Sequence, residues 1–325
     1  MLKDDVYRTL LNETDGYVSG EALSAKLGVS RSAIWKAVKA LKTDGAEIDA
    51  VTNRGYRLAG DSDFLSSSVI LDNLHPDISS RINFDVTVFK SVASTNDYLK
   101  SLAASGAPEG RVVISETQTA GKGRAGRKFS SQRGGVYMSV LLRPRLSLAS
   151  SLKITVWAAV AVARAIENVF GVNASIKWVN DVFCGDKKVC GILTESALDL
   201  ESKTMEYAVL GIGVNAVRPK GGFPEELKDI AGYLSETPQK NLRNRLAAEI
   251  LNEFFLLYFS DDKDFSFAEY KKRLFLLGKA VEVRLEGEKY FATATGLTED
   301  FNLIVRDEKG ETRVLNYGDV SVKKS

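Results

Sequence analysis

The chain has 325 residues, with 44 lysines and arginines against 42 aspartates and glutamates and a formal net charge of +2. This length suggests two or three domains, and so small a net charge means that any contact with nucleic acid must come from a local basic patch. Two cysteines and one histidine exclude a disulfide-rich secreted scaffold and most histidine-based zinc sites. The N-terminal residues MLKDDVYRTL lack the apolar core of a signal peptide, and no stretch approaches 18 uncharged apolar residues. We therefore expect a cytoplasmic protein without a membrane partner.

Residues 1–60 show the pattern of a winged helix-turn-helix domain. Ser19 and Ser30 are plausible caps of two successive helices, and Gly28 ends the first of them, which leaves the short turn that the motif requires. A hairpin around 53–55 stands where such a domain carries its wing. A solvated basic helix is the alternative, but cap, turn and wing together favour DNA binding. The candidate DNA contacts are Ser30, Arg31, Ser32, Lys36 and Arg54.

The rest of the chain divides into a linker and two further domains. Small, polar and acidic residues at 59–68 indicate a linker over 61–79. From 80 to 276, strands and helices alternate, but some strands follow one another directly, which favours an α+β fold with a mixed sheet. We expect strands at 85–90, 111–116, 135–144, 175–179, 189–196 and 205–217, and helices after Ser94, near 148–170, near 240–259 and at 266–276. Residues 277–325 have short strand-like runs between turn signals and predict a small β-barrel of about five strands.

A glycine-rich basic segment, GKGRAGRK, runs over 121–128. It contains G-x-G-x-x-G, but a predicted strand follows it instead of the helix that a dinucleotide-binding fingerprint requires, so we reject that interpretation. Five cations and no acid lie between Gln118 and Arg133. Because such a run repels itself, it indicates a loop that orders around an anion rather than a solvated surface loop. No G-x-x-x-x-G-K-[ST] phosphate loop occurs in the sequence.

Three further polar motifs open or end a predicted element. Lys177 ends a strand shortly before Asn180 and Asp181. A lysine there can neutralise a carboxylate or phosphate, and Asp181 can hold a divalent metal on a nucleotide; a strand-end lysine before an Asn-Asp turn is the alternative, and the motif alone favours it. The hydroxyls and amide of residues 94–96 could bind a neutral polar ligand or simply cap a helix. Asn215 follows GIGV, where a backbone can approach a ligand or form a bulge.

These motifs, in this order, resemble the biotin–protein ligases, specifically the bifunctional class that also represses biotin genes. The resemblance covers nearly the whole chain and is carried by STN (94–96), ETQTAGKGRAGRK (116–128), KWVND (177–181), KVCGILTE (188–195) and GIGVN (211–215). It implies a winged helix, a catalytic domain of the biotin/lipoate ligase type and an SH3-like C-terminal barrel. It also implies that biotin and ATP form biotinyl-5′-AMP, that biotin is transferred to a lysine in the biotin carrier domain of acetyl-CoA carboxylase or another carboxylase, and that biotinyl-5′-AMP is the co-repressor at operator DNA.

The resemblance also implies a role for each matching position. The catalytic residues are Lys177 and Arg124. The biotin-binding residues are Ser94, Thr95, Asn96, Gln118, Lys122, Gly123, Arg124 and Lys177. The residues that bind ATP or the adenylate are Gly121, Arg124, Arg127, Lys128, Asn180, Asp181 and Asn215, with Asp181 also the candidate Mg²⁺ ligand. Two departures from the family pattern, Lys122 for arginine and Val179 for proline, are expected to alter affinity rather than abolish function.

This chemistry suits a chain with one histidine. A carboxylate that attacks an α-phosphate builds negative charge, which lysine, arginine, backbone N–H groups and Mg²⁺ stabilise without a general acid. We expect a homodimer promoted by ligand and matched to two half-sites, with no permanently bound cofactor. Two alternatives stay open: an adenylate-sensing DNA-binding regulator without transfer activity, and a relative that transfers lipoate or octanoate.

Overall fold

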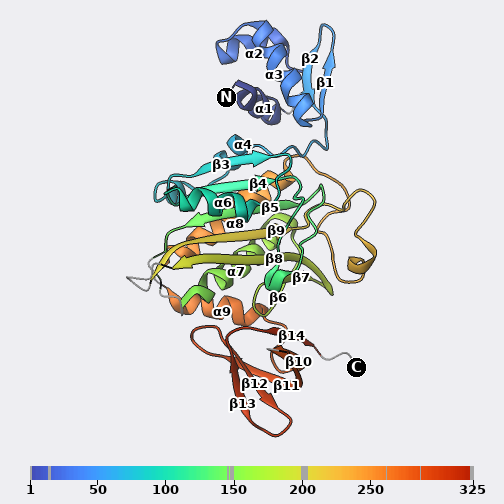
Figure 1. Cartoon of the computed structure of the whole chain (residues 1–325). Helices are drawn as coiled ribbons and strands as arrows, with labels where there is room; N and C mark the ends of the chain where they lie inside the picture. The colour runs from blue at the N-terminus through green and yellow to red at the C-terminus, as the bar shows by residue number, and fades with distance from the viewer. Residues whose placement is uncertain are drawn as a thin grey trace.

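The computed structural model describes residues 2–13, 16–144, 146, 150–198, 204–260, 262–285 and 287–322. It shows three units stacked in chain order, with a helical N-terminal domain at one end, a sheet with helices in the middle, and a β domain at the other end (Figure 1). Within the described residues, no helix is both long and apolar enough to cross a membrane.

The N-terminal domain is the expected winged helix-turn-helix. Its elements are α1 (Leu2–Asn12), α2 (Gly20–Leu27), α3 (Arg31–Asp44), β1 (Ile48–Val51) and β2 (Gly55–Leu58). Ser19 accepts a hydrogen bond from the backbone N–H of Ala22 at 3.0 Å, and Ser30 accepts one from that of Ala33 at 3.2 Å, so both serines cap their helices as predicted. The buried faces of the three helices form a core of their own.

The segment expected to be a linker, 61–79, is instead packed and partly helical. Ser62, Asp63, Leu65 and Ser66 are buried, and α4 (Ser67–Asp72) and α5 (Pro76–Ser79) follow. Its polar groups find partners on α8 (Leu242–Tyr258), where Arg243 pairs with Asp63 and the Asn244 amide oxygen accepts from the backbone N–H of Ser66. Local composition does not reveal this packing, because the partners lie some 180 residues away in sequence.

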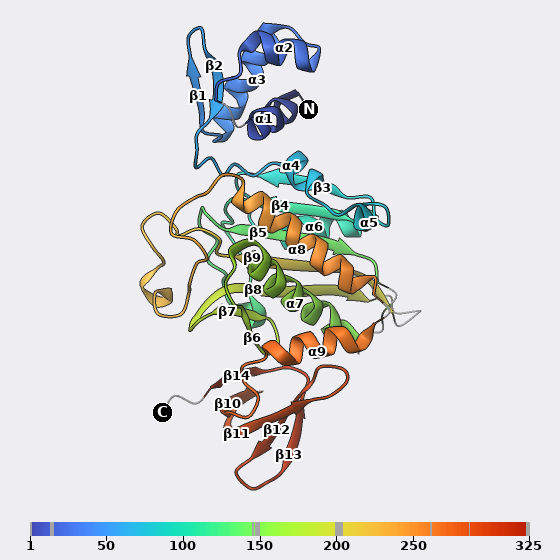
Figure 2. The ribbon, with the colours of Figure 1, turned by 180° about the vertical axis from the view of Figure 1, so that it is seen from behind.

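The central domain has a mixed seven-stranded sheet with the order β3-β4-β5-β9-β8-β7-β6, in which the β3–β4 pair is parallel and the other pairs are antiparallel. The strands are β3 (Asp85–Phe89), β4 (Arg111–Ser115), β5 (Val136–Leu142), β6 (Ser175–Lys177), β7 (Asp181–Cys184), β8 (Lys187–Leu198) and β9 (Met205–Val214). Helices α7 (Ser151–Phe170), α8 and α9 (Lys263–Arg273) cover one face (Figure 2), and α6 (Thr95–Ala104) packs on β4, β5 and β9.

One stretch of this sheet differs from expectation. The strand predicted at 175–179 ends at Lys177, because residues 178–180 form a turn that leads into β7. Pattern reasoning missed β7, since four residues between two turns carry too little periodicity to show a strand. The β6–β7 hairpin places Lys177 opposite Asp181.

The C-terminal domain is a five-stranded antiparallel sheet in the order β13-β12-β11-β10-β14. Its strands are β10 (Ala280–Leu285), β11 (Glu288–Leu297), β12 (Leu303–Asp307), β13 (Thr312–Leu315) and β14 (Asp319–Val322). The expected all-β domain of about five strands is confirmed. Its buried side chains belong to the same hydrophobic cluster as those of the central domain, and the indole N–H of Trp178 donates to the carbonyl of Phe301 at 2.9 Å across the junction. The two domains are therefore one packed unit.

Candidate active site

A cavity of about 430 Å³ opens between the glycine-rich loop, the β6–β7 turn, strands β8 and β9, and the start of β14. Its size and its mixture of apolar walls with a few polar groups suit a small-molecule site. Every residue that the sequence assigned to biotin or adenylate lines it, except Gly121. They are Ser94, Thr95, Asn96, Gln118, Lys122, Gly123, Arg124, Arg127, Lys128, Lys177, Asn180, Asp181 and Asn215.

The glycine-rich loop folds as a narrow hairpin over this cavity. The backbone N–H of Gly123 donates to the carbonyl of Arg127 at 2.7 Å, and that of Phe129 donates to the carbonyl of Gly121 at 2.9 Å. Gly121 does not line the cavity. A Cβ there would lie 2.5 Å from the Phe129 carbonyl oxygen, so this glycine lets the two arms of the hairpin approach each other.

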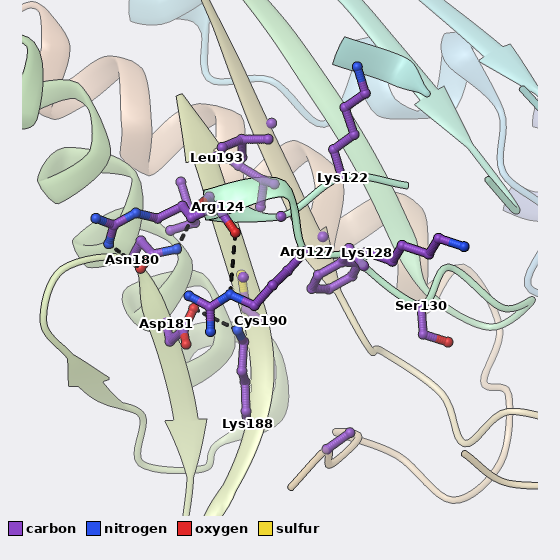
Figure 3. A pocket seen from close by; sticks show the side chains of 18 of the residues that line it. Lys122, Arg124, Arg127, Lys128, Ser130, Asn180, Asp181, Lys188, Cys190 and Leu193 are labelled. Atoms are coloured by element: carbon purple, nitrogen blue, oxygen red, sulfur yellow. Dashed lines mark hydrogen bonds and ion pairs between the residues drawn. The ribbon is translucent and has the colours of Figure 1, made fainter. Parts of the chain in front are cut away.

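Arg124 reaches from the loop to the β6–β7 turn. Its guanidinium donates to the Asn180 side-chain oxygen at 3.1 Å, and the Asn180 amide in turn donates to the Ile192 carbonyl at 2.8 Å (Figure 3). Asp181 pairs with Lys188 at 2.7 Å. Burial lowers the pKa of the Arg124 guanidinium against the opposing effect of Asp181, so a cation is held in a partly dehydrated position where it interacts strongly with an anion.

The C-terminal domain supplies a carboxylate to the same cavity. Asp319 lies 3.4 Å from the Lys177 ammonium and 3.2 Å from the Arg127 guanidinium, and the Ser321 hydroxyl accepts from Lys177 at 2.9 Å. Burial raises the pKa of the Asp319 carboxyl, but Lys177 and Arg127 outweigh that effect and hold it below its ordinary value. Asp319 was missed from sequence because it lies 142 residues beyond Lys177, in another domain and outside any motif.

Hydroxyls and amides form a connected network at the opposite side of the cavity. The Gln118 side-chain oxygen accepts from the backbone N–H of Thr95 at 2.8 Å and from the Thr95 hydroxyl at 3.1 Å. The Ser139 hydroxyl is 2.7 Å from the Thr95 hydroxyl and 2.6 Å from the Asn96 side-chain oxygen. Ser94 caps α6 by accepting from the backbone N–H of Asp97. The capping and the ligand-binding interpretations of this motif are therefore compatible.

Aromatic and aliphatic side chains form the apolar part of the lining, which motif reasoning left out. They include Phe129, Met138, Phe183, Phe223, Leu227 and Ile230. Phe129 packs directly on the backbone of Gly191 and Gly213, where a Cβ would lie 2.8 Å and 2.5 Å from its ring. These two glycines face each other across β8 and β9. The signal that could have found this contact is a glycine inside each of two neighbouring apolar strands.

The predicted DNA contacts are exposed on two elements of the N-terminal domain, α3 and the wing. Arg31, Ser32 and Lys36 are exposed on α3, and the Ser30 hydroxyl is 2.9 Å from that of Ser32. Arg54 is exposed on the wing, with its guanidinium 4.6 Å from the ring centre of Tyr17. The geometry therefore presents one helix and one hairpin tip on the same small domain.

Three segments of the chain match known families. Residues 88–215 match the Biotin/lipoate A/B protein ligase family, 5–57 an HTH domain, and 276–323 the Biotin protein ligase C terminal domain. The Bifunctional ligase/repressor BirA of Bacillus subtilis is 32% identical over 96% of this chain and 96% of its own length. The protein of that name from Escherichia coli is 31% identical over 72% of this chain and 70% of its own length.

Solved structures agree with this result. A biotin protein ligase from Aquifex aeolicus, in complex with biotin and ATP, superposes with a TM-score of 0.62 at 26% identity, covering 74% of this chain and 99% of that one. The relatives from Bacillus and Escherichia combine a ligase with a repressor, and this chain carries the corresponding helix-turn-helix domain. The chain therefore belongs to the biotin protein ligases, within the class of bifunctional ligase/repressors.

Proposed function

We propose that the central cavity joins biotin to ATP as biotinyl-5′-AMP and then passes biotin to a lysine in the biotin carrier domain of acetyl-CoA carboxylase or another carboxylase. The observation that carries this proposal is the convergence of three cations, Lys177, Arg124 and Arg127, on one partly apolar cavity with a hydroxyl–amide network at its other side. A vitamin with an apolar ring system, a polar ureido group and a carboxylate needs all three kinds of surface.

In the first step, a carboxylate oxygen of biotin attacks the α-phosphorus, and the bond from that phosphorus to the pyrophosphate oxygen breaks. Negative charge grows on the α-phosphoryl oxygens. Lys177 and Arg124 stabilise it as cations that the fold already places in the cavity. Before this step, Lys177 and Arg127 are paired with Asp319, so the triphosphate must take over cations that the C-terminal domain already holds in place.

Magnesium suits this cavity as an ion that accompanies the phosphates. Mg²⁺ is commonly bound through one or two carboxylates together with substrate phosphates, and it neutralises charge on the triphosphate when bound. Asp181 and Asp319 are carboxylates in the lining that would hold it. The described residues contain no cluster of three or more histidines, cysteines, aspartates or glutamates.

In the second step, the lysine amine of the carrier domain attacks the carbonyl carbon of the mixed anhydride, an amide bond forms, and AMP leaves. Water must be kept from the anhydride until the acceptor arrives. The hairpin of residues 121–129, which covers the cavity, supplies that shield. Positioning of the amine then carries much of the rate.

The same ligand is proposed to control DNA binding. Biotinyl-5′-AMP acts as co-repressor, and a ligand-promoted homodimer places two helix-turn-helix domains on two half-sites of operator DNA. The contacts are Arg31, Ser32 and Lys36 on α3, with Ser30 at its start and Arg54 on the wing. Their exposure and the positive charge of Arg31, Lys36 and Arg54 support this assignment.

The test of the ligase is incubation of the purified chain with biotin, ATP, Mg²⁺ and an apo biotin carrier domain, followed by mass spectrometry of the acceptor. We expect the acceptor to gain one biotinyl group, and an acceptor whose target lysine is replaced by arginine to gain none. Pyrophosphate release without acceptor labelling would instead support a regulator that senses the adenylate. Labelling by octanoate or lipoate in preference to biotin would identify a fatty-acid transferase.

A further inference from the structure

The outer face of α3 carries a large aromatic side chain among its polar residues. Trp35 is 54% exposed, whereas Trp178 is buried and Trp157 is half-buried. Helical spacing puts it one turn beyond Arg31 and Ser32. The opposite face of α3, with Ile34, Ala37, Val38 and Leu41, fills the core of the N-terminal domain.

This exposure is not needed for folding. An indole left half in water forgoes the free energy that burial would supply, and contact with a partner would recover part of it. The Lys39 ammonium lies 5.1 Å from the ring centre, and the same helix carries Arg31, Lys36 and Lys42 as exposed cations and no acid before Asp44. A cationic rim of this kind fits a polyanion better than a lipid or an apolar protein surface.

We propose that Trp35 contacts the 5-methyl group of a thymine in the major groove and is a specificity-determining residue for the operator. This inference rests on the operator-binding role proposed above. The thymine methyl is the apolar group that base edges offer in the major groove, and apolar side chains recognise it there. Trp35 is four residues beyond Arg31, and this separation corresponds to ~6 Å along the helix.

A rise of ~6 Å along the helix corresponds to about two base steps. Arg31, a guanidinium in the first turn of the helix, is suited to a guanine edge, and Trp35 then meets a thymine about two steps away. The cations Lys36, Lys39 and Lys42 can reach phosphates, which fix the register without reading sequence. The exposed residues of α3 therefore fall into two groups: lysines that position the helix on the phosphates, and Arg31 and Trp35, which read the base sequence.

The experiment uses full-length protein with biotin, ATP and Mg²⁺, and duplexes selected by that protein from a random library. Each thymine of the selected site is replaced in turn by deoxyuridine, which removes only the methyl group. We expect one thymine per half-site to weaken wild-type binding about fourfold when its methyl is lost, the value for one buried methyl group. Removal of the same methyl group should not weaken binding of Trp35→Ala any further. For Trp35→Phe, it should weaken binding by less than about fourfold.

Lys42→Ala is the matched control on the same helix. It should weaken binding to all duplexes about equally and lower the salt dependence, while leaving the deoxyuridine profile of the wild type unchanged. In the opposing case, the wild type selects a site at which replacing each thymine by deoxyuridine changes the binding of the wild type and of Trp35→Ala equally. That result would overturn the Trp35 contact and leave operator binding intact. If the wild type selects no sequence at all, both the DNA-binding role and this contact are overturned.

Discussion

The two terminal domains join the central domain in different ways. The C-terminal sheet shares a hydrophobic core with it, and the first residue of β14, Asp319, pairs with Lys177 inside the cavity. The N-terminal domain keeps a largely separate core and touches the central domain through polar contacts, such as the Lys90 ammonium, which donates to the Thr43 carbonyl at 2.5 Å. The C-terminal domain is therefore part of the active site, whereas the N-terminal domain is attached to the central domain outside the cavity.

The attachment on the N-terminal side includes a buried ion pair. Arg243 on α8 pairs with Asp63 at 2.8 Å, and their side chains are only 6% and 4% exposed. The Asp63 backbone carbonyl accepts from the same guanidinium. The Tyr7 hydroxyl of α1 donates to the carbonyl of the next residue, Phe64, at 3.3 Å. The packed segment thus holds both domains, and it does so outside the cavity.

The largest effect is expected from Arg243→Ala, which leaves Asp63 buried without its partner. Removing one member of a buried pair costs about 3–5 kcal/mol of stability, which urea unfolding will measure. The double variant Asp63→Leu/Arg243→Leu should recover much of this loss, because an apolar pair leaves no unpaired charge. Equal instability of the single and double variants would show that packing, not charge, holds the segment.

Lys177→Ala tests the chemistry of the central domain. Loss of a preorganised charge at the growing phosphoryl anion should lower the rate of adenylate formation by about 100- to 1000-fold, measured as pyrophosphate release. Lys309→Ala, in an exposed turn of the C-terminal domain, is the matched control and should stay within twofold of the wild type. A similar rate for both variants would remove Lys177 from the catalytic assignment.

Asp319→Ala tests whether the C-terminal domain belongs to the active site. Lys177 and Arg127 lose the carboxylate that holds them, and misplaced cations should lower the rate of adenylate formation about tenfold or more. Glu288→Ala removes an exposed carboxylate of the same domain and should have little effect. If Asp319→Ala forms the adenylate at the wild-type rate, the C-terminal domain has only a structural role.

Lys90→Ala tests the exposed contact of the N-terminal domain. Lys90 pairs with Asp44 at 3.7 Å, and its side chain is 57% exposed, so its loss should cost less than about 1 kcal/mol of stability. Adenylate formation should stay within twofold of the wild type, because Lys90 is not in the cavity lining. A drop comparable to that of Asp319→Ala would contradict the contrast between the two ends.

The smallest effect concerns pH. Because the pKa of Asp319 is held below its ordinary value, its ion pairs contribute to stability above the unfolded pKa, near 3.9, and this contribution is lost as the pH falls through the lower folded pKa. The wild type and Asp319→Asn should therefore differ in urea midpoint at pH 7, and the difference should be smaller at pH 3. A constant difference at both values would show that the carboxylate charge is not involved.

Sequence reasoning identified the elements whose signals are local. The caps at Ser19 and Ser30, the hairpin wing and most strands of the central sheet depend on neighbouring residues, and the structure has them where the pattern placed them. The polar loops also gathered at one cavity, because strand ends and a glycine-rich turn have limited ways to meet. Local signals were therefore sufficient for most elements of the fold, whereas the roles of the polar site residues followed from the resemblance to the ligase family.

What sequence reasoning missed depends on partners far away in the chain. Asp63 is acidic in a polar stretch, and only Arg243 on a distant helix makes it a buried residue. Asp319 stands in no motif and acquires a role only when the C-terminal sheet packs on the β6–β7 turn. Phe223 and Ile230 lie between predicted elements, so their place in the lining follows from tertiary structure alone.

The glycine pair beneath Phe129 has a consequence for the shape of the substrate. Gly191 and Gly213 expose bare peptide where other sheet positions would project a side chain, and the phenyl ring occupies the room they leave. At this point, the phenyl ring of Phe129 therefore forms part of the cavity wall over the two strands. A smaller side chain at Phe129 should enlarge the cavity enough to admit a bulkier biotin analogue. A larger side chain at Gly191 or Gly213 should instead push the phenyl ring into the cavity.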